Sequence, residues 1–228
     1  MFRKKRRRNT MARKVIVKEN PKSVIAEQYR TIRTNINFSM PDSDFKTILV
    51  TSAGPSEGKS TTAANIAGVF SGEDKRIILV DADMRKPTSH HTFKVSNIYG
   101  LSGVLTRQCE LSDAIQQTDI QGLYVLPSGA IPPNPAELLD SNRMNQLLET
   151  LKSQFDLIIF DTPPILTVTD SQILSNKCDA TILVINSGKT EKEMAVKAKE
   201  MLTLSKANMI GVVLNNFTIE KNHYFYYQ

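Results

Sequence analysis

Short apolar runs alternate with helix-like segments along almost the whole chain, and this alternation restricts the fold more than any other feature. Each run is continuously apolar, as strands are when both faces of a sheet are covered. Parallel strands also need a crossover, usually a helix, between them. The runs are TILVTSA, RIILVDAD, LYVLPSG, DLIIFDTPP, ATILVINSG and MIGVVLNN. The sequence therefore predicts a single doubly wound α/β domain, with a mostly parallel sheet and helices on both faces.

The segments between these runs carry helix signals. Asn20 and Pro21 together predict an N-cap followed by proline in the first turn, opening a helix through KSVIAEQYRTIRTNINF. One long amphipathic helix is expected over PAELLDSNRMNQLLETLKSQF. Shorter helices are expected at TTAANIAGVFS, GLSGVLT, ELSDAIQQ, DSQILSN and EKEMAVKAKEMLTLS. No internal repeat or interior linker is evident, which favours one domain.

The net charge of +6 is concentrated at the start of the chain. Residues 1–14 contain many Lys and Arg and no acid, so the remainder is slightly acidic. We predict a basic flexible arm over residues 1–19, a folded domain over residues 20–216 and a flexible end over residues 217–228. A basic arm suits anionic lipid head groups or nucleic acid, or is simply solvated. The absence of a basic domain argues against specific nucleic-acid binding.

No apolar run approaches the roughly 18 residues that a membrane span needs, and no signal peptide follows the charged start. Cys109 and Cys178 lie far apart and have no metal-binding spacing. These observations predict a reduced, cytoplasmic protein without a disulfide. If the protein works at a membrane, another component must hold it there.

The segment SAGPSEGKST joins a predicted strand to a predicted helix. It matches the phosphate-binding loop G-x-x-x-x-G-K-[ST] except that Ala53 replaces the first glycine. Backbone N–H groups and the helix N-terminus attract phosphate, Lys59 would reach the β and γ phosphates, and Ser60 would coordinate Mg²⁺. An ordinary strand-to-helix turn is the alternative. The predicted ATP-binding residues are Gly54, Pro55, Ser56, Glu57, Gly58, Lys59, Ser60 and Thr61, with Asn215 near the last strand as a candidate for the base.

Acidic residues end two other predicted strands. Asp161 ends DLIIFDTPP, where a Walker B strand supplies a carboxylate for Mg²⁺. Asp81 and Asp83 are two apart, so strand alternation sends both side chains to one side. Two close carboxylates repel unless a cation lies between them, and one can take a proton from an incoming hydroxyl. The predicted metal ligands are Ser60, Asp83 and Asp161, the predicted catalytic residues are Lys59, Asp81 and Asp83, and Arg85 and Lys86 are candidates to steady phosphate or acceptor.

Together these motifs resemble the bacterial tyrosine kinases, or BY-kinases, of capsule and exopolysaccharide synthesis. The likeness extends from about Pro21 to Gln228 and includes SAGPSEGKS as Walker A, IILVDADMR as the second Walker A′, LIIFDTPP as Walker B and a final tyrosine cluster. The resemblance implies ATP and Mg²⁺ as cofactors and transfer of the γ-phosphate to tyrosine, with Asp81 as the base. Ser56 stands where many members have glycine, a departure that we do not expect to abolish function.

The resemblance also gives a meaning to both ends of the predicted domain. EQYRTIR contains Glu27, Arg30 and Arg33, which match a family motif that joins subunits into a ring, often an octamer. A solvated, self-paired helix face is the alternative. The tyrosine cluster is implied to be autophosphorylated by a neighbouring subunit, which adds charge and weakens the ring; a frayed aromatic tail is the alternative. The cluster consists of Tyr224, Tyr226 and Tyr227.

A chain of this kind without a predicted span resembles the layout typical of Firmicutes. That layout implies a cytoplasmic kinase recruited to the inner face of the membrane by a separate membrane-spanning activator of the polysaccharide chain-length family. It also implies tyrosine-bearing protein substrates and a cognate phosphotyrosine phosphatase. The loop GAIPPNPAELL, residues 129–139, is left as an acceptor or activator surface.

Two other functions remain as alternatives. A MinD- or ParA-like ATPase shares the fold, but such proteins usually carry lysine as the second residue of the phosphate loop, where this chain has Gly54. A non-catalytic nucleotide-binding regulator is disfavoured by the complete set of Lys59, Ser60 and the three aspartates.

Overall fold

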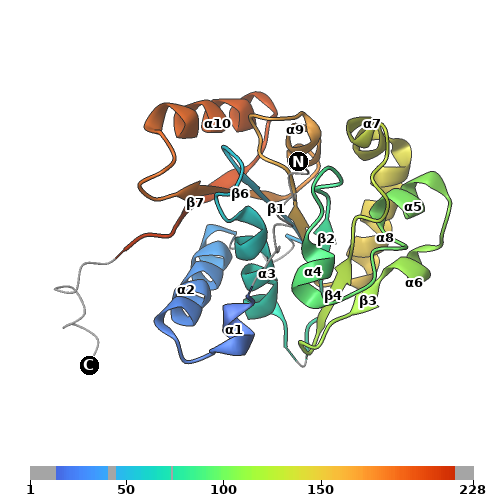
Figure 1. Cartoon of the computed structure of the whole chain (residues 1–228), viewed down its shortest axis with the longest axis horizontal. Helices are drawn as coiled ribbons and strands as arrows, with labels where there is room; N and C mark the ends of the chain where they lie inside the picture. Colours follow the sequence, from blue (N-terminus) through green and yellow to red (C-terminus); the bar gives the residue numbers. More distant parts are fainter. Residues whose placement is uncertain (1–13, 41–44, 73, 219–228) are drawn as a thin grey trace, which may run out of the picture.

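The computed structural model describes residues 14–40, 45–72 and 74–218. A seven-stranded sheet lies between two layers of helices, in the order β3-β4-β2-β5-β1-β6-β7 (Figure 1). All neighbouring strands are parallel except β3 and β4. The strands are β1 Thr47–Ser52, β2 Ile77–Asp81, β3 Gln116–Gln117, β4 Leu123–Leu126, β5 Leu157–Asp161, β6 Ala180–Asn186 and β7 Met209–Asn215. The predicted fold class, a doubly wound α/β domain with a mostly parallel sheet, is confirmed.

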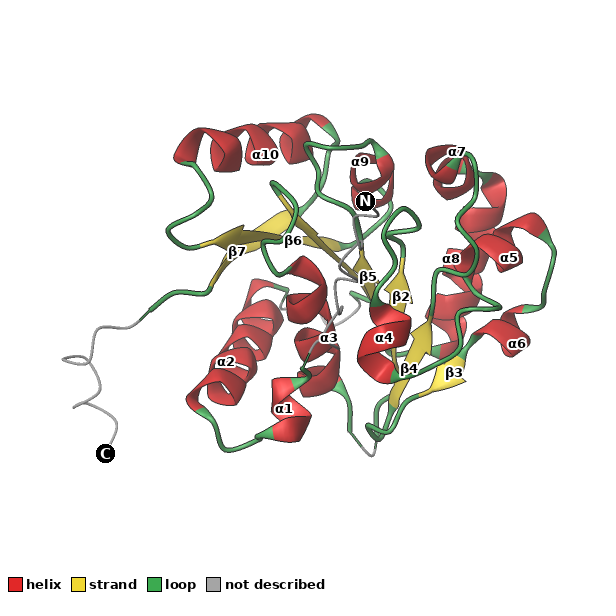
Figure 2. Cartoon of the chain, in the orientation of Figure 1, coloured by secondary structure: helices red, strands yellow, loops and turns green. Residues whose placement is uncertain are grey.

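Ten helices occur in the described part of the chain, and they divide between the two faces of the sheet (Figure 2). The first group, α1 to α4, covers one face, and the later helices cover the other. The helices are α1 Ile16–Glu19, α2 Val24–Ser39, α3 Lys59–Phe70, α4 Ser89–Phe93, α5 Leu101–Thr106, α6 Leu111–Ala114, α7 Pro135–Asp140, α8 Asn142–Gln154, α9 Asp170–Ser175 and α10 Lys192–Leu204.

Alternate residues of each central strand supply the two cores. In β1, Ile48 and Val50 pack with residues of α2 and α3, whereas Leu49 packs with the cluster formed by α5 to α9. All three are fully buried. Because both faces of the strand need apolar residues, the strand reads as an uninterrupted apolar run.

Two helix boundaries differ from the sequence prediction. The helix α2 begins at Val24, not after Asn20, because Ser23 is the N-cap and its Oγ accepts a hydrogen bond from Ala26 N. The long amphipathic helix is broken at Ser141, whose backbone is extended and whose Oγ accepts from Met144 N. An internal serine that caps a new helix is hard to distinguish from a solvated serine within one.

The predicted flexible arm of residues 1–19 is wrong for its last residues. Val15 is 6% exposed, and the short helix α1 follows it. Asn65 of α3 holds this segment at two points, since its side chain accepts from Val17 N and donates to Lys14 O. The apolar sequence VIV therefore overrides the charge of its neighbours. Residues 1–13 lie outside the described part of the chain.

The C-terminal strand β7 lies at the end of the sheet opposite β3. The chain is described beyond it as far as Thr218, and the predicted phosphoacceptors Tyr224, Tyr226 and Tyr227 lie outside the described residues. Of the helices that are described, not one combines the length and the apolar character required to cross a bilayer.

Candidate active site

The site forms where three neighbouring strands end. The order β2-β5-β1 brings the phosphate loop after β1 next to the acidic ends of β5 and β2. Asp161 is the register partner of Val50 on one side and of Asp81 on the other. Residues from distant parts of the sequence therefore meet at the carboxyl edge of the sheet, where such folds bind ligands.

Two backbone positions of the phosphate loop adopt the left-handed conformation. Gly58 has φ +97°, and a Cβ there would lie 1.9 Å from Asn215 Nδ2, so only glycine fits. Ser56 has φ +65°, a conformation that costs most residues about 1 kcal/mol or more. The positive φ explains why glycine suits position 56, where this chain has serine and many BY-kinases have glycine.

The alanine that replaces the first glycine of the motif fits without strain. Ala53 does not have a positive φ, and its methyl group packs in a small core cluster with Ile165 and Leu183. Its backbone N–H donates to Glu57 Oε2 at 3.0 Å. The other oxygen of Glu57 accepts from Thr190 Oγ1 at 2.7 Å. The side chain of Glu57 thus braces the phosphate loop internally and faces the protein.

Asn215, predicted to read the base, lies directly against the phosphate loop. It ends β7, and its Nδ2 donates to Glu57 O at 2.9 Å. The contact joins the last strand to the loop that would hold phosphate. Asn215 therefore lies beside the phosphate loop, while its contact with a base remains a prediction.

Lys59 opens α3 and lies among the acidic strand ends. Its Nζ is 2.9 Å from Asp83 Oδ2, 3.5 Å from Asp161 Oδ1 and 3.2 Å from Ser60 Oγ. Burial alone lowers the pKa of the ammonium, but the charges of Asp161 and Asp83 outweigh it and the net shift is upward. Lys59 is therefore held in its charged form, as a phosphate-binding lysine must be.

The predicted magnesium ligands converge on one point. Oxygens of Ser60, Asp83 and Asp161 all lie within 3.5 Å of the Lys59 ammonium, so these groups already surround a positive charge. Among the described residues, no cluster of three or more His, Cys, Asp or Glu side chains is arranged to bind a metal unaided. Mg²⁺ commonly uses one or two carboxylates together with substrate phosphates, so the three oxygens fit a nucleotide-bound Mg²⁺.

Asp81 has a different environment from Asp83. It is fully buried, and its Oδ2 accepts from Thr88 N at 2.9 Å and from Ser89 N at 2.8 Å. Burial and then the charge of Asp161 raise the pKa of Asp81 from 3.8 to about 6. A carboxylate with a pKa near neutrality, held in fixed orientation, suits a general base.

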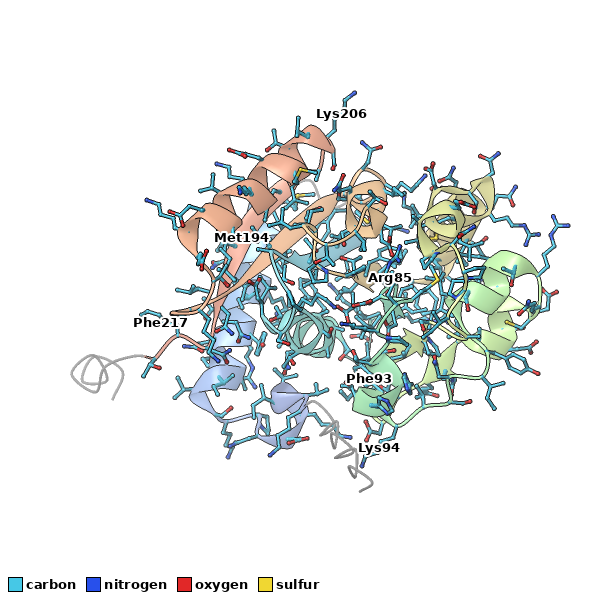
Figure 3. The ribbon with its side chains drawn as sticks, turned by 45° about the horizontal axis from the view of Figure 1, so that its top comes forward. Arg85, Phe93, Lys94, Met194, Lys206 and Phe217 are labelled. Carbon is cyan, nitrogen blue, oxygen red and sulfur yellow. The ribbon has the colours of Figure 1, made fainter. Side chains whose placement is uncertain are left out.

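The structure gives Arg85 a partner that the sequence did not indicate. Its guanidinium donates to both carboxylate oxygens of Asp170, from Nε at 3.0 Å and from Nη2 at 2.9 Å. Figure 3 labels Arg85 near the middle of the molecule. Asp170 is fully buried and opens α9. Next to it, Ser171 Oγ donates to Pro163 O in the loop after Asp161. Arg85 thus links the two acidic loops in the described structure, where the sequence had suggested a phosphate or acceptor contact.

Sequence reasoning missed Asp170 and Thr190. Asp170 lies 85 residues from Arg85, and Thr190 lies 133 residues from Glu57. Both residues read in the sequence as ordinary helix-start residues, and no spacing rule couples them to the motifs.

The residues Glu27, Arg30 and Arg33 all belong to α2, which packs on α3. Arg30 Nη1 contacts Glu27 Oε2 at 2.7 Å, whereas Arg33 Nη1 donates to Val69 O at 2.6 Å. Glu27 and Arg30 are therefore paired on the surface, and Arg33 fastens α2 to α3. Their role between subunits stays a prediction.

A phosphate loop opposed by acids from two neighbouring strands defines a P-loop nucleotide-binding protein equipped for phosphoryl transfer. Residues 45–206 match the family model described as an AAA domain. The chain is 50% identical to the tyrosine-protein kinase YwqD of Bacillus subtilis over 225 residues, 98% of this chain and 95% of that protein. It is 41% identical to the tyrosine-protein kinase CpsD of Streptococcus pneumoniae, covering 87% of each.

Solved structures agree with these relatives. The chimerical protein CapA2B2 superposes with a TM-score of 0.87 at 43% identity, covering 90% of each chain. The chain belongs to the bacterial tyrosine kinases, in the branch of cytosolic kinase subunits of capsule and exopolysaccharide systems, and it is a protein-tyrosine kinase. As a P-loop kinase it uses ATP.

The MinD-like alternative shares only the fold. The septum site-determining protein MinD of Pyrococcus horikoshii, complexed with Mg-ADP, has a TM-score of 0.65 at 22% identity, covering 77% of this chain and 72% of that chain. The alternative of a MinD-like function is therefore set aside in favour of the kinase.

Proposed function

We propose that this kinase phosphorylates the tyrosine cluster of its own C-terminal segment, Tyr224, Tyr226 and Tyr227, in trans within a ring oligomer. The observation that carries the proposal is the convergence of Lys59, Asp83 and Asp161 beside the buried Asp81. Lys59 binds the β and γ phosphates, and Ser60, Asp83 and Asp161 would hold Mg²⁺, which would supply positive charge to the phosphates. Asp81 accepts the proton of the tyrosine hydroxyl as the hydroxyl oxygen bonds to the γ-phosphorus, while the bond between that phosphorus and the bridging oxygen breaks and ADP leaves.

In this proposal the nucleotide lies along the carboxyl edge of the sheet, from β7 toward β2. Its phosphates lie on residues 54–61, and Asn215 contacts the base near β7. The γ-phosphate then points toward β5 and β2, which carry the acids. Phosphorylation adds about −1.5 to −2 charges per tyrosine, and repeated addition weakens contacts between subunits. Glu27 and the half-buried Arg30, which form an ion pair with each other, are the members of the motif that we expect to make those contacts.

The activator in this proposal is a membrane-spanning protein of the polysaccharide chain-length family. The solved relative CapA2B2 is a chimerical protein, which supports a partnership of this kind for that relative. For this chain, the activator would recruit the cytoplasmic kinase to the inner face of the membrane, where the basic residues 1–14 favour anionic lipid. Other tyrosine-bearing proteins and a cognate phosphotyrosine phosphatase complete the proposed cycle.

Mass spectrometry after incubation with Mg²⁺-ATP tests the proposal. The wild type is compared with Lys59→Met, and with Lys199→Met on the exposed side of α10 as a matched control, each with and without a membrane extract as activator source. We expect phosphate on the tail tyrosines of the wild type and the control, and none on Lys59→Met. Hydrolysis of ATP with no tyrosine modified, even with activator present, would contradict the proposal and return attention to a MinD-like ATPase.

A further inference from the structure

Two loops beside the active site expose large apolar side chains. Ile98 and Tyr99 lie between α4 and α5 and are 78% and 50% exposed. Ile131 lies in the loop after β4 and is 65% exposed. We call these three residues the apolar platform. Solitary exposed apolar residues are common, but three on two joined loops form a candidate surface for contact with another molecule.

The two loops are fixed to each other by backbone and side-chain hydrogen bonds. Asn97 makes a reciprocal pair with Gly129, because its Nδ2 donates to Gly129 O and its Oδ1 accepts from Gly129 N. Leu101 N donates to Pro127 O. The approach is so close that a Cβ on Gly100 would lie 2.2 Å from Gly129 N. The platform is therefore presented on a rigid support, which lowers the entropy cost of binding.

The platform lies next to the acids in the row of strand ends. Residue 131 follows β4, and β4 is the direct neighbour of β2, which ends at Asp81. In the proposed function, the base lies near β7, the phosphates follow β1, and the γ-phosphate points toward β2. In phosphoryl transfer the attacking oxygen lies opposite the leaving oxygen. The acceptor must therefore enter from the side of β2, and the next strand on that side is β4.

We propose that the apolar platform is a docking subsite for the aromatic residues that flank the acceptor tyrosine, supplied by residues 223–227 of a second copy of this chain. This rests on the proposed function and adds the surface that recognises the acceptor. In the segment HYFYY every tyrosine has an aromatic neighbour, because Phe225 lies between Tyr224 and Tyr226 and Tyr227 follows Tyr226. In an extended peptide, a residue two positions from the acceptor lies roughly 7 Å from it. The spacing between the neighbouring strands β2 and β4 is about 5 Å. A ring that flanks an acceptor beside β2 can therefore reach the loop that follows β4.

The position of β7 favours a second copy as the source of this segment. The described chain continues from β7 to Thr218, and Phe217 in this stretch is 61% exposed. Between β7 and β2 lie β6, β1 and β5, a separation of roughly 19 Å at the usual strand spacing. Figure 3 shows Phe217 at one edge of the molecule, apart from Phe93 and Lys94, which lead into the platform loops. A chain's own segment would have to cross the nucleotide to arrive from the acceptor side.

The test measures how well a peptide of residues 217–228 is phosphorylated by full-length kinase. Ile98→Ser, Tyr99→Ser and Ile131→Ser are compared with Leu204→Ser, which changes a side chain that is 76% exposed at the end of α10. We expect KM for the peptide to rise about fivefold or more in the platform variants, with kcat and KM for ATP unchanged. A second peptide keeps a single acceptor tyrosine and has serine in place of Phe225 and the other tyrosines. Its KM should be equally high with the wild type, the platform variants and Leu204→Ser.

Several results would contradict the proposed docking role of the apolar platform. One is an unchanged KM for the aromatic peptide in all three variants. Another is a loss of activator stimulation or of oligomer mass with that KM unchanged, which would assign the surface to a different partner. If the wild type phosphorylates neither peptide nor its own tail, the proposed function itself fails, and the platform fails with it. Because all three side chains are exposed, loss of folding is not expected, and thermal melting checks this.

Discussion

Two positions of the phosphate loop show that the same left-handed backbone conformation can restrict the choice of residue to different degrees. Ser56 and Gly58 both have positive φ. At Ser56 the cost is confined to the backbone of that residue. At Gly58 the surrounding structure adds a second restriction, since Asn215 occupies the space of a Cβ.

We predict that Gly58→Ala abolishes tight ATP binding and destabilises the domain by more than 1 kcal/mol, on the scale of local backbone strain. Ser56→Gly should leave ATP binding intact and should stabilise the fold by about 0.5–1 kcal/mol. Nucleotide titration and denaturant unfolding measure the two effects. Normal ATP affinity in Gly58→Ala would show that Asn215 moves aside easily.

Asp81 supplies a pH-dependent test at the same scale. Its pKa is raised from 3.8 to about 6 in the folded protein, so the folded state binds the proton more tightly than the unfolded state. Ionisation of Asp81 therefore lowers the free energy of unfolding. The loss develops as the pH rises from 3.8 to about 6 and is complete above about pH 6. Asp81→Asn carries no such charge.

We accordingly expect the stability of Asp81→Asn relative to the wild type to increase between about pH 4.5 and about pH 7.5 in Mg²⁺-free buffer. Urea unfolding at both pH values measures the difference. The exposed Asp113→Asn is the matched control and should show a much smaller change. A constant difference for Asp81→Asn would mean that its carboxyl group titrates normally.

At the scale of elements, the ion pair between Arg85 and Asp170 joins the loop after β2 to the N-terminus of α9. Since Ser171 in turn donates to Pro163 O, we infer that the pair helps to hold the spacing of Asp83 and Asp161. Arg85 is a positioning residue in this interpretation, because it acts through the acids. An arrangement of this kind affects the rate when reacting groups must be held within a fraction of an ångström.

Arg85→Gln and Asp170→Asn should each lower kcat roughly tenfold or more, and the double variant should be no worse than either single one. KM for ATP should change little. Lys152→Gln, which breaks the exposed pair with Glu149, serves as control. Steady-state kinetics and thermal melting are measured together. A lower melting temperature with an unchanged kcat would leave the pair with a purely structural role.

At the scale of the whole molecule, the ring motif can be tested without disturbing the fold. Arg33 holds α2 on α3 through Val69 O, so its replacement would confuse packing with assembly. Glu27 and Arg30 form an ion pair on the surface, and Arg30 Nη2 also donates to Pro21 O. An exposed pair contributes little to the stability of the subunit.

We therefore predict that Glu27→Ala with Arg30→Ala lowers the oligomer mass and the rate of tail phosphorylation, while the melting temperature changes by only a few degrees. Light scattering measures the mass. The matched control replaces Lys152 and Glu149 on α8 by alanine. An unchanged mass would favour the solvated, self-paired face that the helix pattern also allowed.

The sequence by itself determined the sheet, the family and the three motif-bearing strand ends. Buried strands must be apolar throughout, and phosphate binding demands a fixed order of residues, so both leave local patterns. The position of Ala53 shows the limit of such patterns, since its fit depends on the cluster around Ile165 and Leu183 and on the carboxylate of Glu57.

Only the tertiary structure decided which distant residues support the motifs. It paired Arg85 with Asp170, placed Asn215 against Gly58, split the long helix at Ser141 and joined the two platform loops through Asn97. The physical reason is the same in each case. These contacts are made between strand ends and loops that adjoin only after the sheet has formed, and a single contact between distant residues leaves no periodicity in the chain.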